Sequence, residues 1–269
     1  MNPIDSLFQQ LRAQERKAFI PFITAGDPSL ATTLALVTEL ARRGAALIEI
    51  GFPYSDPIAD GSVIQASYTR ALKSGTRVDD IFATFKKARP ANDARGVPLV
   101  AMVSYSLVHH RGPGTFIAQA HDAGFSGAIV PDLPVEEAEE LAKLCAQDDF
   151  KLIQLVTPTT PRERAQRIAR LSTGFLYCVS VVGITGERAR IPPQLLEQLR
   201  WLRSQTDLPL CVGFGISRPE HVELLRAVAD GIIVGSALVR HLGQIGSTPE
   251  DAVIREIGEQ VTLMVDALQ

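Results

Sequence analysis

The chain has 269 residues, of which 46% are hydrophobic and 21% charged, and its 27 basic and 30 acidic side chains leave a formal net charge of −3. So balanced a charge argues against a nucleic-acid binder that works through a basic surface, and the apolar content is too high for a disordered chain. The longest uncharged stretch, residues 171–186, is shorter than the ~20 apolar residues of a membrane-spanning helix.

The cysteines and the N-terminus point to a reducing compartment. Cys145, Cys178 and Cys211 are far apart and form no CxxC pair, which fits free thiols better than disulfides or a zinc site. The first residues mix charged and apolar side chains and lack the apolar core of a signal peptide. We therefore expect a cytoplasmic globular protein with no metal.

Eight short runs rich in branched residues recur along the chain, and near-continuous apolar runs of this kind are typical of parallel strands covered on both faces. The expected strands are Phe19–Thr24, Ala46–Ile50, Pro98–Val103, Gly127–Val130, Lys151–Val156, Phe175–Val179, Leu208–Gly213 and Gly231–Val234.

Helical patterns lie between these runs. Leu30, Leu34 and Val37, for example, recur at helical spacing behind a start signal at residues 27–29. Eight strand–helix units predict an α/β fold, a single (β/α)8 TIM barrel over residues 1–269 with extra helices at Asn2–Gln14 and Pro249–Leu268. An open doubly wound sheet would also alternate, but the count of eight favours the barrel.

Two carboxylates lie where a barrel of this kind carries its chemistry, at and beyond the carboxyl end of a strand. Glu49 stands inside an apolar strand, where burial would raise its pKa and suit it to general acid/base catalysis. A structural salt bridge is the alternative. Asp60 follows in a loop that could fold over the barrel mouth, although Asp60 before Gly61, and Asp56 before Pro57, also fit ordinary turns.

Three glycine-containing loops could hold an anion. VGFGIS (Val212–Ser217) and VGSA (Val234–Ala237) follow the last two expected strands, where barrels commonly bind phosphate on backbone N–H groups and helix dipoles. The loop after the sixth strand contains GITG (Gly183–Gly186) and could form a lid whose Gly186 amide joins that site. Plain turns, and an ordinary long loop, are the alternatives.

Six motifs in this order resemble the tryptophan synthase alpha chain family over essentially the whole sequence. They are PFITAGDPS (Pro21–Ser29), EIGFPYSDPIADG (Glu49–Gly61), VPDLPVEE (Val130–Glu137), GITG (Gly183–Gly186), GFGIS (Gly213–Ser217) and VGSALV (Val234–Val239). The resemblance implies a carbon–carbon lyase of tryptophan biosynthesis that cleaves indole-3-glycerol phosphate to indole and glyceraldehyde 3-phosphate by a retro-aldol reaction.

The resemblance also assigns roles to residues of this sequence. Glu49 would shuttle the protons and Asp60 would stabilise the charge on the indole nitrogen. Phe22 and Tyr177 would line the indole pocket, and Asp56 and Thr185 would join two loops on closure. The phosphate would lie on the backbone of Gly186, Phe214, Gly215, Gly235 and Ser236.

The family implies a beta-subunit partner in an alpha2beta2 heterotetramer, with pyridoxal phosphate only in that partner. Docking is expected near Asp56, Pro57 and Asp132. Ser104–Ser106 replace a family stretch that is rich in Tyr and ends in Asn, and Ser62 replaces a frequent Pro. Two rival functions are another phosphate-binding barrel, such as an isomerase, and a non-catalytic barrel that binds phosphorylated metabolites. Neither calls for Glu49 and Asp60 together.

Overall fold

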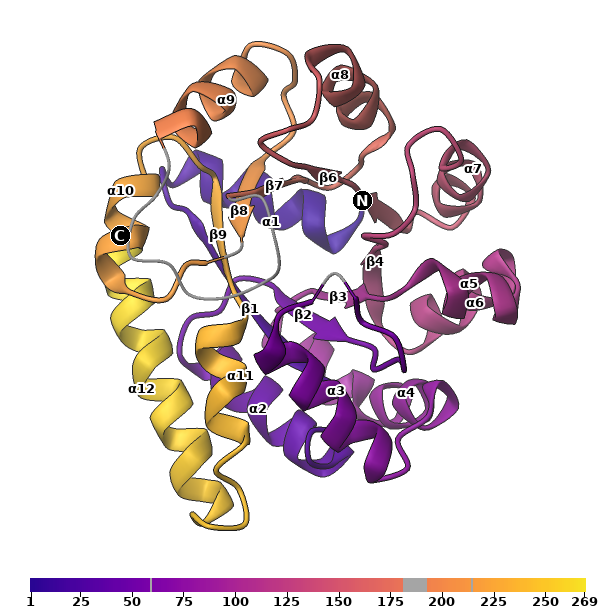
Figure 1. Ribbon diagram of the computed structural model, residues 1–269, viewed down its shortest axis with the longest axis vertical. Helices are drawn as coiled ribbons and strands as arrows, with labels where there is room; N and C mark the ends of the chain where they lie inside the picture. Colours follow the sequence, from indigo (N-terminus) through magenta and orange to yellow (C-terminus); the bar gives the residue numbers. More distant parts are fainter. Residues whose placement is uncertain (59, 181–192, 214) are drawn as a thin grey trace.

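The computed structural model describes residues 1–58, 60–180, 193–213 and 215–269, and its strands form one parallel sheet that curls into a barrel inside a ring of helices (Figure 1). The described strands are β1 (Ala18–Thr24), β2 (Ile48–Gly51), β3 (Leu99–Met102), β4 (Phe125–Ile129), β5 (Lys151–Ile153), β6 (Leu155–Val156), β7 (Leu176–Val179), β8 (Leu210–Gly213) and β9 (Gly231–Val234). The helices over these same ranges are α1 (Pro3–Ala13), α2 (Leu30–Arg42), α3 (Ser62–Lys73), α4 (Val78–Arg95), α5 (Tyr105–Arg111), α6 (Pro113–Asp122), α7 (Glu139–Gln147), α8 (Arg162–Leu171), α9 (Pro193–Arg203), α10 (Pro219–Leu225), α11 (Ser236–Leu242) and α12 (Glu250–Leu268).

The barrel closes through a single run of chain. The strand order is β5-β4-β3-β2-β1-β9-β8-β7-β6, so the first and last strands of the sheet are neighbours in sequence, joined at Gln154. One strand was expected over residues 151–156. Instead, residues 151–153 pair with β4, and residues 155–156 pair with β7. The expected eight-stranded barrel is confirmed, with its fifth strand divided where the backbone changes partner.

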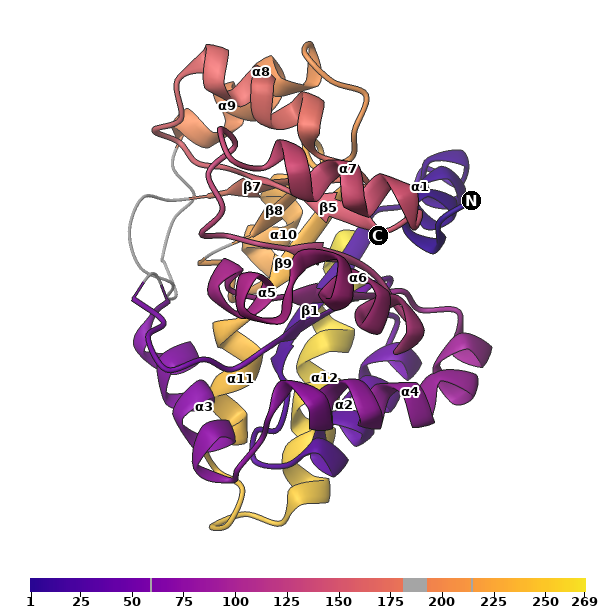
Figure 2. The same ribbon diagram turned by 90° about the vertical axis from the view of Figure 1, so that its right-hand side faces the viewer.

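The amino ends of the strands are closed by α1, which lies at the right-hand side of Figure 2. Its buried residues Ile4, Phe8 and Leu11 belong to the apolar cluster inside the barrel. Phe8 packs on Phe175 with ring centroids 5.8 Å apart. Asn2 caps α1 by accepting a hydrogen bond from the backbone N–H of Ile4. Both expected terminal helices are therefore present, and the site must use the opposite end.

Aromatic residues fill the space between the barrel and its outer helices beside β2. Phe52, directly after β2, packs on Phe82, Phe116 and Phe125 with ring centroids 5.4–6.1 Å apart. Side chains alternate across a strand, so the outward packing of Phe52 turns Gly51 and Glu49 toward the barrel interior.

None of the helices within the described residues is long and apolar enough to cross a membrane.

A buried ion pair ties the loop after β1 to α3. Asp27 is fully buried, and its carboxylate accepts hydrogen bonds from Arg70 Nε at 2.8 Å, from Arg70 Nη2 at 2.6 Å and from the hydroxyl of Ser67. A bidentate guanidinium and a hydroxyl together compensate the lost hydration of the carboxylate. The pair fixes α3, the helix that follows the loop containing Asp60.

We expect Arg70→Met to lower the free energy of unfolding by about 3 kcal/mol, because it leaves the buried Asp27 carboxylate without its cation. Urea denaturation measures this. The matched control is Arg42→Met, which breaks the exposed pair with Glu39 and should cost less than about 1 kcal/mol. Equal costs for the two variants would contradict a special role for the Asp27–Arg70 pair.

Candidate active site

Glu49 projects from the middle of β2 into the barrel. In the sheet it lies beside Phe22 of β1 and Val100 of β3, and its side chain is 0% exposed. Neither carboxyl oxygen has a hydrogen-bond partner among the residues that the structure describes. Burial therefore raises the pKa of Glu49 well above its ordinary value. The expected buried acid is confirmed, and no described residue forms the alternative salt bridge.

Asp60 lies in the loop between β2 and α3. Its backbone N–H donates to the carbonyl of Pro57 at 3.1 Å, and Gln65 of α3 donates through Nε2 to the carbonyls of Asp60 at 2.7 Å and Pro57 at 3.2 Å. Burial raises the pKa of Asp60 to about 6, although a hydrogen bond from Tyr54 lowers it. Gln65 was not singled out from the sequence, and an amide in the first turn of a helix carries no signal for this role.

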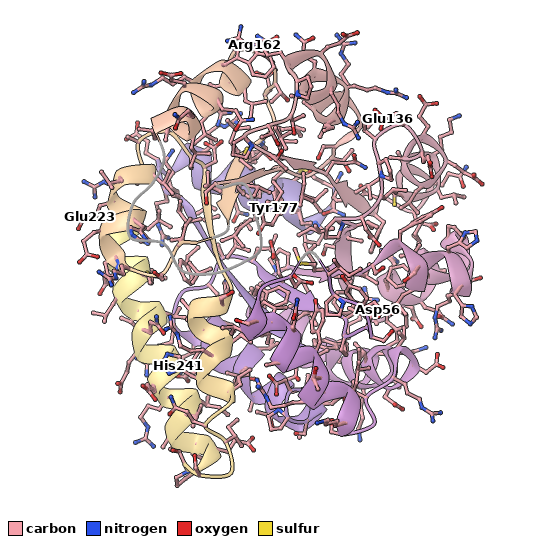
Figure 3. All side chains as sticks on the ribbon, in the orientation of Figure 1. Asp56, Glu136, Arg162, Tyr177, Glu223 and His241 are labelled. Atoms are coloured by element: carbon pink, nitrogen blue, oxygen red, sulfur yellow. The ribbon has the colours of Figure 1, made fainter. Side chains whose placement is uncertain are left out.

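Two rings expected at the indole pocket lie over glycines of neighbouring strands. A Cβ on Gly51 would stand 2.4 Å from Cζ of Phe22, and one on Gly213 would stand 2.3 Å from the hydroxyl oxygen of Tyr177. Any larger residue at these two positions would force the rings to shift, since real Cβ contacts are essentially never this short. Figure 3 shows Tyr177 near the middle of the barrel. Burial, and next the charge of Glu49, raise the pKa of Tyr177 well above its ordinary value.

Two further tyrosines border Asp60. Tyr68 of α3 is buried, and its ring centroid lies 5.6 Å from that of Tyr54. Both line a small cavity with Asp60 and Met102. The stripe Ile64, Tyr68 and Ala71 could have shown that Tyr68 faces the barrel, because these residues share one helix face. The sequence did not show that this face overlooks Asp60.

The glycines after the last two strands stand where an anion could be bound. Gly215 has a φ of +76°, a conformation that favours glycine, and Gly235 immediately precedes Ser236, the first residue of α11. A Cβ on Gly235 would lie 3.5 Å from the ring of Phe22, so this turn packs against that ring. Phe214, Thr185 and Gly186, the other expected residues of this region, lie outside the described residues.

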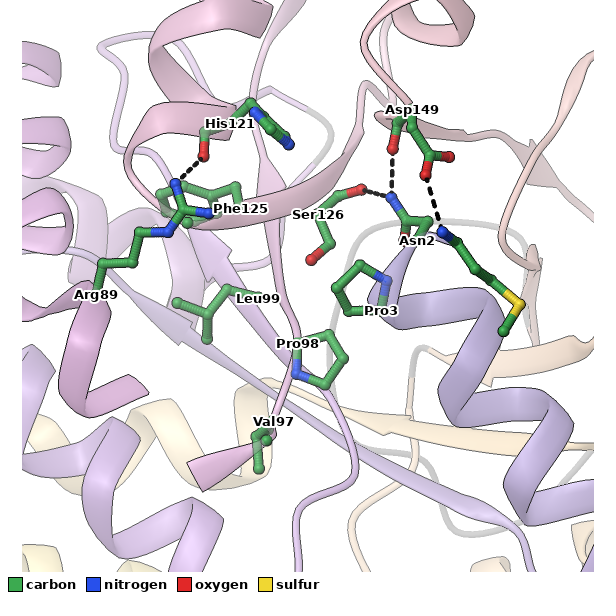
Figure 4. Close-up of a pocket in the computed structure, with 13 residues that line it drawn as sticks. Asn2, Pro3, Arg89, Val97, Pro98, Leu99, His121, Phe125, Ser126 and Asp149 are labelled. Atoms are coloured by element: carbon green, nitrogen blue, oxygen red, sulfur yellow. Dashed lines mark hydrogen bonds and ion pairs between the residues drawn. The ribbon is translucent and has the colours of Figure 1, made fainter. Parts of the chain in front are cut away.

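A larger cavity, of about 510 Å³, lies at the opposite, amino end of the barrel (Figure 4). Its polar groups hold the fold together: Asn2 donates to the carbonyls of Ser126 and Asp149, and Arg89 donates to the carbonyl of His121. No group of three or more potential ligands for a metal occurs among the residues described. Cavity volume alone therefore does not identify the candidate active site. The buried carboxyl group of Glu49 identifies it.

Comparisons with known proteins agree with this geometry. A family model described as the tryptophan synthase alpha chain matches residues 8–268. The chain belongs to the tryptophan synthase alpha chain family. The alpha chain of Rhodopirellula baltica is 50% identical over 266 residues, covering 96% of each chain. That of Rippkaea orientalis is 46% identical over 254 residues, covering 94% of this chain and 93% of that one.

Solved structures of the family share the fold. Tryptophan synthase subunit alpha from Legionella pneumophila has a TM-score of 0.89 and 34% identity, covering 100% of this chain and 98% of that one. A chain of the tryptophan synthase complex from Pyrococcus furiosus has a TM-score of 0.83 and 35% identity, covering 93% and 99%. As a member of this family, the chain is an enzyme, a carbon–carbon lyase of tryptophan biosynthesis that cleaves indole-3-glycerol phosphate.

The residues expected to meet a partner lie at the surface near the site. Asp56 is exposed and accepts a hydrogen bond from the hydroxyl of Ser55 at 2.9 Å. Asp132, also exposed, accepts from the hydroxyl of Ser104 at 2.7 Å and from the N–H of Tyr105 at 2.8 Å. Ser104 and Ser106, which depart from the family pattern, thus belong to the cap of α5, where the Ser104 hydroxyl also accepts from the N–H of Ser106.

We expect Gly51→Ala to lower indole release at least tenfold, because its methyl group would displace the ring of Phe22 from the pocket beside Glu49. Steady-state kinetics with indole-3-glycerol phosphate measures the loss. Gly114→Ala is the matched control, since a Cβ there meets nothing within 4 Å, and it should keep full activity. Wild-type kinetics in Gly51→Ala would contradict the placement of the Phe22 ring.

Proposed function

We propose that Glu49 and Asp60 carry the cleavage of indole-3-glycerol phosphate in this chain. The observation that supports this most strongly is Glu49 itself, a carboxyl group buried without a described partner beside Phe22. Burial raises the pKa of such a group, so it keeps its proton to a higher pH than an ordinary glutamate and can give that proton away inside the barrel. An acid that served only the fold would be paired or replaced by an apolar residue.

The proposed reaction balances with one acid group. Glu49 gives its proton to C3 of the indole ring, and the positive charge then resides on the ring nitrogen. The Glu49 carboxylate takes the proton of the adjacent glycerol hydroxyl, and the bond from C3 to that carbon breaks. Its electrons return to the ring, so indole and an aldehyde leave and Glu49 is again protonated. No external proton or cofactor is needed.

Asp60 serves the intermediate in this proposal. A carboxylate held beside the ring nitrogen stabilises the positive charge that C3 protonation creates, and a fixed charge in a water-poor site is more effective than one in bulk water. Asp60 and Glu49 need opposite protonation states. Their surroundings support that division, because the pKa of Asp60 is about 6 whereas burial raises that of Glu49 well above its ordinary value.

The remaining assignments complete the proposal. Phe22 and Tyr177 would hold the indole ring, and the phosphate would lie on the backbone of Gly215, Gly235 and Ser236, together with Gly186 and Phe214. Helix N-termini favour such an anion without a cluster of basic side chains. Thr185 would join Asp56 when the loops close over the substrate.

We further propose that the chain works in the cytoplasm, bound to a tryptophan synthase beta subunit in an alpha2beta2 assembly that receives the indole. The pyridoxal phosphate would belong to that partner. Support comes from the exposed loops around Asp56, Pro57 and Asp132, and from Ile58, an apolar side chain that is 85% exposed next to the site. Large exposed apolar side chains are frequent at the centres of protein interfaces.

The test supplies indole-3-glycerol phosphate and follows indole release, with and without a tryptophan synthase beta subunit. We expect Glu49→Gln to lose at least about 100-fold in kcat, because the amide cannot give or take the proton. Asp60→Asn should lose less, since it removes only charge stabilisation. Glu39→Gln, on α2 where the carboxylate pairs with Arg42 and Arg43, is the matched control and should keep full activity. Unchanged kcat in Glu49→Gln would overturn its role, and no release by wild type with the beta subunit would overturn the function.

We expect kcat/KM to follow a bell-shaped pH profile, because Asp60 must be ionised and Glu49 protonated. Below its pKa of about 6, Asp60 takes up a proton, so the rate should fall about tenfold per pH unit on the acid side. Above the raised pKa of Glu49 the general acid is lost and the rate should fall again. Asp60→Asn should abolish the acid limb, and an unchanged acid limb in that variant would contradict the assignment.

A further inference from the structure

Gln65 of α3 reaches back from the helix to the loop that carries Asp60. It stands in the first turn of α3, and the side chains of a helix point toward its amino end. Its Nε2 donates to the backbone carbonyl of Asp60 at 2.7 Å and to that of Pro57 at 3.2 Å. The Asp60 N–H donates to the same Pro57 carbonyl at 3.1 Å. One amide group therefore joins both ends of this turn to the helix.

The helix that carries this amide is anchored in the protein. Tyr68, one turn further along α3, is 2% exposed. Arg70 and Ser67 both donate to the carboxylate of Asp27, which is fully buried after β1. Gln65 itself is half-buried. Its amide thus extends from a fixed helix to the loop, and the loop takes its position from the helix.

The position of the Asp60 carboxylate follows from that of its backbone. An aspartate side chain has only two rotatable bonds, so its carboxylate cannot move far unless the backbone moves. Here the side chain lines a cavity of about 100 Å³ together with Tyr54 and Tyr68. A charge stabilises an intermediate best when it is held in place before the reaction begins, and a misplacement of about 1 Å can cost about 100-fold in rate. The backbone contact made by Gln65 therefore bears on the chemistry.

We infer that Gln65 is a positioning residue for the reaction: it holds the backbone of Pro57 and Asp60 against α3 and thereby fixes the Asp60 carboxylate at the cavity. The inference rests on the proposed function of Asp60. The positive charge on the indole nitrogen exists only after C3 is protonated, so a displaced carboxylate slows the reaction and leaves substrate binding nearly unchanged. An amide that only stabilised α3 would act on the unfolding of the chain instead.

The test measures kcat and KM for indole-3-glycerol phosphate with the chain bound to a beta subunit. We expect Gln65→Met to lower kcat about tenfold and to change KM less than about twofold, because methionine has a similar length and helix propensity but no donor. The midpoint of urea unfolding should stay close to that of the wild type, since the side chain is only half-buried.

A second variant, Gln65→Glu, separates positioning from helix stability. An ionised carboxylate cannot donate to the two carbonyls, whereas an acidic side chain near the amino end of a helix favours the helix. We therefore expect kcat to fall at least as far as in Gln65→Met, without a lower midpoint of unfolding. Wild-type kcat in either variant, or a rise in KM alone, would overturn the inference.

The matched control is Gln166→Met, which makes the same change on α8, where Nε2 donates to Oε1 of Gln205 at 2.7 Å. It should keep full activity. A double-mutant cycle decides whether Gln65 acts through Asp60: in the Asp60→Asn background, Gln65→Met should change kcat less than about twofold. An equal loss in both backgrounds would overturn the inference. Full activity of Asp60→Asn, or no indole release by the wild type, would instead overturn the function on which it rests.

Discussion

The free-energy cost of burying an ionised carboxyl group inside the barrel determines the properties of the site. Glu49 lies among apolar strands, and among the described residues nothing donates to it or pairs with it. In such surroundings the charged form is strongly disfavoured, so the group holds a proton that an exposed glutamate would have lost. In the proposed function, the substrate is the partner that receives this proton.

Two glycines and two aromatic rings pack together in the barrel interior on the strands around Glu49. Gly51 and Gly213 have no side chains to fill the interior, and the rings of Phe22 and Tyr177 occupy the space instead. Behind the sheet, Phe52 packs outward among other aromatic rings and thereby fixes which face of β2 turns inward. Packing on both faces of β2 thus sets which side chains surround Glu49, the residues proposed to hold the indole ring among them.

The second acid is placed by a different means. Asp60 belongs to a loop and depends on side chains from α3: the amide of Gln65 holds its backbone, and Tyr68 supports the ring of Tyr54. That helix is itself tied to the loop after β1 by Asp27 and Arg70. A strand thus holds Glu49, the proposed proton carrier, and a loop held by a helix carries Asp60, the proposed stabilising charge. The opposite end of the barrel, closed by α1, takes no part.

The sequence by itself determined the number of strand–helix units, the burial of Glu49 and the family, because apolar runs, an acid within one of them and six motifs in order are local features of the chain. It missed the division of residues 151–156, since only the sheet shows that the backbone changes partner at Gln154. It also missed Gln65, Tyr54 and Tyr68. Their roles depend on how α3 lies over the barrel, and the long-range pair of Asp27 with Arg70, 43 positions apart, decides that placement. Only tertiary contacts bring such residues together.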